Sequence, residues 1–198
     1  MLVAPTYHST VTESSNRYVL RFNTAVEYAP CVEILVIRHG DAVEQAPGLG
    51  DPGRWLTGEG RKRTRQVANW LTEHDERRPV EVWTSPIVRA VQTAEIVADA
   101  AGLTDEVSVH AALSTAGNAT DTLHLLARYQ GHGPLALVGH EPTLSSLAVS
   151  LLGKVHWPGF AKSSVLGVTW NGHGTARFRF LLNPKSMNVT TDLKRLKG

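Results

Sequence analysis

The chain has 198 residues, of which 42% are hydrophobic and 19% are charged. This length suits one domain with a substantial core, and the composition excludes disorder over most of the chain. The 20 lysines and arginines against 18 aspartates and glutamates leave a formal net charge of +2, which gives no reason to expect nucleic acid or an anionic membrane as a partner.

Two features of the sequence concern the compartment. The single cysteine, Cys31, cannot form a disulfide within the chain, and burial statistics favour a small buried residue over a nucleophile. The first residues lack a basic start followed by a long apolar run, and no later segment has about 18 uninterrupted apolar residues. We therefore expect a cytoplasmic protein that is neither exported nor embedded in a membrane.

The chain divides into three parts. Residues 1–31 are polar and punctuated by prolines, so we treat them as an N-terminal extension of uncertain structure. Residues 32–184 carry the alternating strand and helix signals of one domain, and residues 185–198 form a basic C-terminal tail.

The first clear element is a strand at 32–37, whose run Val-Glu-Ile-Leu-Val-Ile is typical of a parallel strand covered on both faces. The run ends directly in Arg-His-Gly at 38–40. A polar, glycine-rich loop follows, after which Thr57 caps a helix that we expect to end near Glu73.

A second strand and helix follow this unit. The strand is predicted at 80–84, with Ser85 as the N-cap and Pro86 in the first turn of the next helix. Apolar residues recur at helical spacing along this segment, and Gly102 is expected to end it.

The next elements are a weaker helix at 120–129 and a short buried strand at 135–138, which runs into His140. Pro142 then opens a helix that Gly153 closes. The apolar positions of this helix recur every three to four residues, so we expect one of its faces to be buried.

The last predicted element is an antiparallel hairpin, formed by 165–170 and 176–182 around an Asn-Gly-His-Gly turn. Strands that alternate with helices imply an α/β fold, and we predict a three-layer α/β/α sandwich with a mostly parallel central sheet. Right-handed crossovers would let the strands at 32–37 and 135–138 lie near each other despite their separation in the sequence.

Several residues suited to phosphate chemistry fall at or near the ends of predicted strands, where ligands of open α/β sheets bind. A neutral imidazole such as that of His39 can attack phosphorus directly and form a phosphohistidine without a metal or cofactor. The phosphoryl oxygens then need cationic or donor partners, which Arg38, Arg89 and His140 can supply. Gly40 has no side chain, so the backbone and its amides can approach a phosphate closely.

Each of these residues also has a simpler interpretation when it is taken alone. The Arg-His-Gly run can be an incidental surface turn, Arg89 a solvated helix cation and His140 a satisfied histidine at a strand end. Asp41 and Glu141 adjoin the site in sequence, where a carboxylate can orient a histidine or only cap and solvate a loop. The remaining histidines show no paired spacing suited to a metal, so no metal site is predicted.

Four stretches read together are far more specific: LVIRHGDA (35–42), LTGEGRKRTRQVANWL (56–71), WTSPIVRAVQTAEIVA (83–98) and LVGHEPTLSSL (137–147). In this order they resemble the successive motifs of the histidine phosphatase superfamily, which also includes cofactor-dependent phosphoglycerate mutases. Within that superfamily they are most similar to the SixA-type phosphohistidine phosphatases.

The resemblance implies a phosphoglycerate mutase-like fold and a cofactor-independent phosphatase whose catalytic domain is the part at 32–184. It implies that His39 is the nucleophile and carries the phosphohistidine intermediate. It also implies that Arg38, Arg89 and His140 surround the phosphate, since each stands at an identical motif position.

The motifs do not identify the residue that protonates the leaving group, and so they do not fix the class of substrate. Mutases and many small-ester phosphatases of the superfamily carry a carboxylate between the second arginine and the second histidine, which protonates the leaving oxygen. The corresponding stretch here, 110–126, offers only Asp121 at a predicted helix start, while Asp105 and Glu106 read as loop residues. A phosphohistidine imidazole leaves more readily than an alkoxide, so a missing acid favours P–N over P–O substrates.

The short stretch between Arg89 and His140 leaves little chain for a covering lid, and an open site admits a protein. We therefore predict a phosphatase that acts on phosphohistidine proteins. The alternatives are a phosphatase for a small phosphate ester and a noncatalytic phosphate-binding module. The sequence leaves the oligomeric state open.

Overall fold

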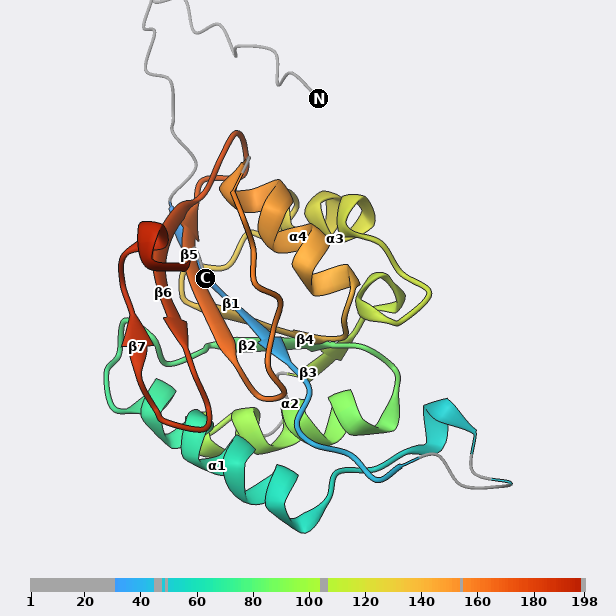
Figure 1. The fold of residues 1–198 in the computed structure, drawn as a ribbon. Helices are drawn as coiled ribbons and strands as arrows, with labels where there is room; N and C mark the ends of the chain where they lie inside the picture. Colours follow the sequence, from blue (N-terminus) through green and yellow to red (C-terminus); the bar gives the residue numbers. More distant parts are fainter. Residues whose placement is uncertain (1–30, 45–47, 49, 104–106, 154, 197–198) are drawn as a thin grey trace, which may run out of the picture.

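The computed structural model describes residues 31–196 except for 45–47, 49, 104–106 and 154, so the expected extension at 1–31 lies outside the described residues apart from Cys31. The described strands form one sheet in the order β3-β2-β4-β1-β5-β6-β7, and helices cover both of its faces (Figure 1). The strands are β1 (Val32–Arg38), β2 (Glu81–Thr84), β3 (Val107–Val109), β4 (Leu135–Gly139), β5 (Val165–Trp170), β6 (Arg177–Leu182) and β7 (Val189–Thr190). The helices are α1 (Gly58–Thr72), α2 (Val88–Ala101), α3 (Ala119–Leu126) and α4 (Thr143–Leu152), with short 3-10 helices η1 (Asp51–Gly53), η2 (Ala111–Leu113) and η3 (Leu193–Leu196).

One half of the sheet is the parallel set β3, β2, β4 and β1. β1 pairs with β4 in the register Ile37↔Val138, so the two strands predicted to lie near each other are direct neighbours. Most of β1 and all of β4 are buried, because helices cover both faces of the sheet there. This double coverage is the physical reason for their continuous aliphatic runs.

The other half of the sheet is antiparallel: β5 pairs with β1, β6 with β5 and β7 with β6. The predicted α/β/α sandwich is confirmed, but the sheet is mixed rather than mostly parallel. The difference arises because the predicted hairpin, β5 and β6, joins the free edge of β1 directly. An antiparallel pair needs only a short turn, whereas a parallel neighbour needs a long crossover.

Several short elements differ from the sequence prediction. The edge strands β3 and β7 were not predicted, because strands of three and two residues are too short to show an alternating pattern. Both β7 and η3 come from the segment that the sequence assigned to a basic tail, and Leu196 in η3 is buried. The helix predicted at 120–129 ends earlier, at Leu126.

The side chains of β1 alternate between two hydrophobic clusters, one on each face of the sheet. Leu35 and Ile37 pack in the cluster that contains α1 and α2, while Ile34 and Val36 pack in the cluster that contains α3 and α4. This period of two is the geometry of an extended strand, and it assigns the helix pairs to opposite faces (Figure 1). No helix in the described part of the chain is long and apolar enough to cross a membrane.

The predicted N-cap residue is confirmed for α1 and is wrong for α2. Thr57 caps α1, and its hydroxyl accepts a hydrogen bond from the Gly60 amide at 2.9 Å. The prediction of Ser85 as the N-cap of α2 is wrong, because this helix begins at Val88 with Ile87 as its N-cap. Ser85 lies between β2 and α2, and its hydroxyl accepts a hydrogen bond from the amide of Ile87 at 3.2 Å.

The topology brings several strand ends to one edge of the sheet. β1, β2 and β4 run in the same direction, so the residues that follow them, His39, Ser85 and His140, share that edge. β5 runs in the opposite direction and begins at the same edge. There the Ser163 amide donates to the carbonyl oxygen of Arg38 at 3.0 Å, which ties the antiparallel half of the sheet to the Arg-His-Gly segment.

Helix α1 approaches the chain after β1 so closely at Gly60 that no side chain fits there. A Cβ at this position would lie 2.1 Å from the carbonyl oxygen of Asp41. We expect Gly60→Ala to lower the free energy of unfolding by about 1–3 kcal/mol, because two backbone segments would have to separate. Urea denaturation measures the change.

Gly58 in the same helix provides the matched control, since a Cβ there meets nothing within 4 Å. Alanine has the higher helix propensity, so Gly58→Ala should leave the free energy of unfolding unchanged or raise it by up to about 1 kcal/mol. Equal losses in the two variants would contradict the packing explanation.

Candidate active site

Three side chains from three elements meet at this edge of the sheet: His39 after β1, Arg89 in the first turn of α2 and His140 after β4. The Nε of Arg89 donates to Nε2 of His39 at 3.2 Å, and the centroids of the two imidazole rings are 4.9 Å apart. The three residues are 7%, 5% and 1% exposed, respectively. The structure therefore gathers three of the predicted site residues in one buried group.

The hydrogen bonds of His39 indicate which ring nitrogen carries the proton. Nδ1 lies 2.7 Å from the carbonyl oxygen of Gly40, which can only accept, so Nδ1 is the protonated nitrogen. Nε2 is therefore unprotonated, and its lone pair accepts the hydrogen bond from Arg89. The unprotonated nitrogen of this ring therefore faces a guanidinium group.

Both histidines are neutral at pH 7 because they are withdrawn from water. Burial is the main cause that lowers the pKa of His39 from 6.5 to about 4, and the Arg89 and Arg38 cations lower it further. Burial likewise lowers the pKa of His140 to about 3, with smaller contributions from His39 and Arg89. A neutral imidazole is the form that can attack an electrophile.

Arg89 is held on its far side by Asp51 of η1. Its Nη1 donates to the Asp51 carbonyl oxygen at 2.9 Å and its Nη2 donates to the carboxylate at 3.0 Å. Arg54 donates to the other carboxylate oxygen of Asp51 at 3.0 Å. Partial burial acts to raise the pKa of Asp51, but the hydrogen bonds from Arg89 and Arg54 outweigh it and keep the pKa below its ordinary value. Asp51 is therefore a carboxylate that neutralises the buried cation.

Arg38, the last residue of β1, contacts the loop before β5. Its Nη1 donates to the carbonyl oxygen of Phe160 at 2.5 Å. The amide of Phe160 donates to the Glu141 carboxylate at 2.6 Å, so one peptide segment joins Arg38 to the residue that follows His140. The Nε of Arg38 is buried and has no hydrogen-bond partner among the described residues.

Gly40 is required for close packing, and its amide is already used. A Cβ at Gly40 would lie 2.6 Å from the Thr64 hydroxyl. The Gly40 amide donates to the Thr93 hydroxyl at 3.0 Å, and that hydroxyl donates to the Arg89 carbonyl at 2.7 Å. The Gly40 amide was expected to contact phosphate. In the structure it instead donates to Thr93 of α2 and so links the chain after β1 to that helix.

The two acidic residues next to the motif histidines have structural partners. The Asp41 carboxylate accepts from Thr57 at 3.1 Å and forms an ion pair with Lys162. The Glu141 carboxylate accepts from Ser145 at 2.9 Å, in addition to the Phe160 amide. These carboxylates hold loops at the edge of the site.

Two residues that contact the predicted group, Asp51 and Ser85, were not predicted as site residues from the sequence. Asp51 lies in a glycine-rich loop with no pattern that points to Arg89, so only the folded chain brings the two together. Ser85 was assigned to helix capping, although its hydroxyl lies 2.9 Å from Nε2 of His140. The signal that could have identified Ser85 is its place directly after a strand at the predicted ligand edge.

No group of three or more His, Cys, Asp or Glu side chains within the described ranges is arranged to hold a metal ion. The expectation that Cys31 is buried is wrong, since it is exposed just before β1. Asp121 caps α3 together with Asn118, whose side chain accepts from the Asp121 amide at 2.9 Å and donates to its carboxylate. Asp105 and Glu106 lie outside the described residues.

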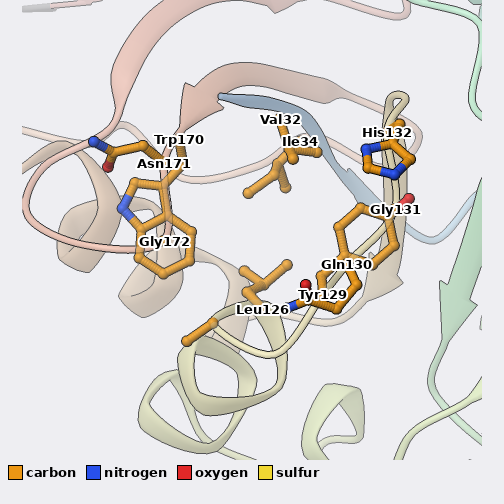
Figure 2. A pocket seen from close by; sticks show the side chains of 11 residues that line it. Val32, Ile34, Leu126, Tyr129, Gln130, Gly131, His132, Trp170, Asn171 and Gly172 are labelled. Carbon is orange, nitrogen blue, oxygen red and sulfur yellow. The ribbon is translucent and has the colours of Figure 1, made fainter. Parts of the chain in front are cut away.

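A pocket of about 140 Å³ lies at the other end of the sheet (Figure 2). Ile34 near the start of β1, Trp170 at the end of β5 and Leu126 at the end of α3 form its apolar walls, while Tyr129 and His132 close one side. This pocket contains none of the predicted site residues.

Comparison with known proteins identifies the family of this chain. The family model described as histidine phosphatase superfamily (branch 1) matches residues 34–118. An uncharacterised protein of Picosynechococcus is 35% identical over 144 residues, which cover 69% of this chain and 84% of that protein. The chain belongs to the histidine phosphatase superfamily.

Relatives with a stated activity place this histidine phosphatase near SixA proteins. The phosphohistidine phosphatase SixA of Escherichia coli K12 is 28% identical over 165 residues, which cover 80% of this chain and 98% of SixA. A structure of the protein histidine phosphatase SixA in complex with tungstate superposes with a TM-score of 0.72 at 28% identity, over 79% of this chain and 99% of that one. The protein is thus a phosphatase with a histidine nucleophile.

We expect the free energy of unfolding of this histidine phosphatase to fall as the pH is lowered from 6.5 toward 4. In this window the unfolded chain binds protons at His39 and His140 and the native protein does not, so stability present above pH 6.5 is progressively lost. Urea denaturation from about pH 7.5 to 4.5 measures the slope.

Two variants separate the buried histidines from the other titrating groups. His140→Asn should make the decline shallower, whereas His156→Asn, which changes an exposed histidine, should keep the wild-type slope. A His140→Asn variant with an unchanged slope would show that this ring titrates as it does in water.

Proposed function

We propose that His39 is the nucleophile of this phosphatase and that Arg38, Arg89 and His140 bind the phosphoryl group. The observation that carries the proposal is the Nε2 lone pair of His39, which faces Arg89 while the Gly40 carbonyl fixes the proton on Nδ1. In the first step a bond forms between Nε2 and phosphorus as the bond to the leaving group breaks. Water then attacks the phosphohistidine, releases phosphate and restores the neutral ring.

Unused hydrogen-bond donors support the assignment of the phosphate site. Nε of Arg38 and Nδ1 of His140 are both buried without partners among the described residues. Buried donors without partners are costly, and a phosphoryl oxygen is an acceptor that would satisfy them. An incoming phosphoryl group also displaces the Arg89 Nε from His39 Nε2, which frees that donor for the equatorial oxygens.

We further propose that the substrate is a phosphohistidine protein. This proposal rests on the lack of a carboxylic acid that could protonate a leaving group among the candidate residues Asp51 and Asp121. One relative, which aligns with 80% of this chain, is the phosphohistidine phosphatase SixA. Asp51 is paired with Arg89 and ionised, and Asp121 is bound in the cap of α3. A leaving imidazole can depart without a strong acid, whereas an alkoxide gains much from one.

One observation favours the alternative of a small phosphate ester. His39 and Arg89 are nearly buried, and the η1 segment covers Arg89, so a compact substrate reaches them more easily than a folded surface. The covering chain comes from the loop after β1 and not from the stretch between Arg89 and His140, whose short length was the reason to expect an open site. The third alternative, a noncatalytic phosphate-binding module, has no observation in its favour.

We expect phosphate to be trapped on His39 when turnover of a labelled substrate is quenched without acid. His39→Ala should lose the label and reduce turnover to background, because it removes the attacking nitrogen. Arg38→Ala and Arg89→Ala should each reduce kcat/KM by about 10²–10³-fold, as loss of an oxyanion donor does, and Arg89→Lys should restore only part. All assays contain EDTA.

The control is His124→Ala, which changes an exposed histidine of α3 and should retain the wild-type rate and labelling. Label on another residue, or near-wild-type turnover by folded His39→Ala, would rule out the assignment.

We expect a phosphohistidine peptide to be hydrolysed at least about 10²-fold faster than phosphoserine, because no strong acid assists an alkoxide. Measurement of kcat/KM for the two substrates gives the ratio, and an aryl phosphate should fall between them. Asp121→Asn should leave the ratio unchanged, since that carboxylate caps a helix. Equal rates on both substrates, or selective loss of phosphoserine hydrolysis in this variant, would refute the substrate proposal.

A further inference from the structure

Ser85 and His140 form a buried pair at the edge of the active site. They follow the neighbouring strands β2 and β4, and they are 0% and 1% exposed. The Ser85 amide donates to the carbonyl oxygen of Val138 at 3.0 Å, which fixes the serine backbone beside β4. The Ser85 Oγ lies 2.9 Å from Nε2 of His140.

The hydrogen bonds of the Ser85 hydroxyl determine which partner donates. The hydroxyl oxygen already accepts from the Ile87 amide at 3.2 Å, and its one proton still needs an acceptor. Within the described part of the chain, the only acceptor bonded to this hydroxyl is Nε2 of His140. The serine therefore donates, Nε2 accepts, and the proton of the neutral ring is on Nδ1.

The opposite tautomer leaves more groups unsatisfied. If Nε2 carried the proton and donated to Ser85, the serine proton would lose its acceptor and Nδ1 would be a buried lone pair without a donor. With the proton on Nδ1, one group remains open, the Nδ1–H itself. Each unsatisfied buried polar group carries a free-energy cost, so the arrangement in which the serine donates is the more stable one.

We propose that Ser85 is a positioning residue that fixes the tautomer of His140, so that Nδ1–H is a hydrogen-bond donor for the phosphoryl oxygens. The proposal rests on the proposed phosphate site and goes beyond it, because it assigns opposite tasks to the two rings. His39 presents a lone pair to phosphorus, and His140 presents an N–H to oxygen. Ser85 itself touches neither the phosphorus nor the leaving group.

The first test uses the wild-type protein with ¹⁵N-labelled histidine, in which protonated and unprotonated ring nitrogens have well separated chemical shifts. The His140 signals are assigned by their loss in His140→Gln. At pH 7 we expect a protonated Nδ1 and an unprotonated Nε2 for His140. A protonated Nε2 would overturn the inference, whatever the activity.

The second test is Ser85→Ala, which removes the donor to Nε2. We expect the His140 signals to move toward an average of the two tautomers, and kcat/KM for an aryl phosphate to fall by about 10–100-fold, less than for loss of a direct donor. Thr122→Val is the matched control, because it removes a buried hydroxyl that bonds only to backbone carbonyls beside α3. It should keep the wild-type His140 signals and kcat/KM.

The readouts distinguish a positioning role from a structural one. Ser85 also accepts from the Ile87 amide, so Ser85→Ala lowers the melting temperature under either explanation. Unchanged His140 nitrogen shifts with unchanged kcat/KM in folded Ser85→Ala would refute the positioning role. Phosphate trapped on His39 together with a protonated Nε2 of His140 would refute this inference alone and leave the proposed nucleophile intact.

Discussion

The parallel pairing of β1 with β4 is the constraint on which the site depends. The register Arg38↔Gly139 places the next residue of each strand, His39 and His140, side by side at the same edge. The His39 amide donates to the Gly139 carbonyl at 3.1 Å, which continues the ladder for one more step. The two imidazoles are thus positioned by backbone hydrogen bonds of the central sheet, and rigid elements of this kind hold functional groups more accurately than loops do.

A second constraint is electrostatic, because the site must bury cations and keep its histidines neutral. Arg89 is almost entirely removed from water, and its cost is offset by the Asp51 carboxylate and carbonyl. The same positive charge, together with burial, keeps His39 unprotonated. The cation that we propose binds the phosphoryl group therefore also keeps the proposed nucleophile unprotonated.

The sequence predicted the elements whose pattern is local, and it missed those set by tertiary contacts. The aliphatic run of β1 and the Thr57 cap of α1 were correct because each depends on neighbours in the chain. The antiparallel half of the sheet forms because the hairpin pairs with β1. The sequence of the hairpin does not indicate which strand it will pair with.

The same distinction applies to the candidate site. His39, Arg89 and His140 carry recognisable motifs, and the structure brings them together, while their roles remain proposals. Asp51 and Ser85 act through contacts with residues 38 and 55 positions away, so a local pattern cannot predict them. The cap expected at Ser85 was wrong because the helix begins only at Val88. The Ser85 hydroxyl accepts from the amide of Ile87, which precedes the helix, and also bonds to His140 after β4.

The short strands β3 and β7 have a consequence for association between copies of the protein. Each edge of the described sheet ends in a strand of only three or two residues, so few backbone groups are free to pair with another chain. Long, flat edges recruit further strands and promote aggregation, whereas short ones stop that growth. The hydrophobic strands β1 and β4 lie in the interior of the sheet, where strands of another copy cannot pair with them. The outermost strands, β3 and β7, are the shortest of the sheet and offer few backbone groups for such pairing.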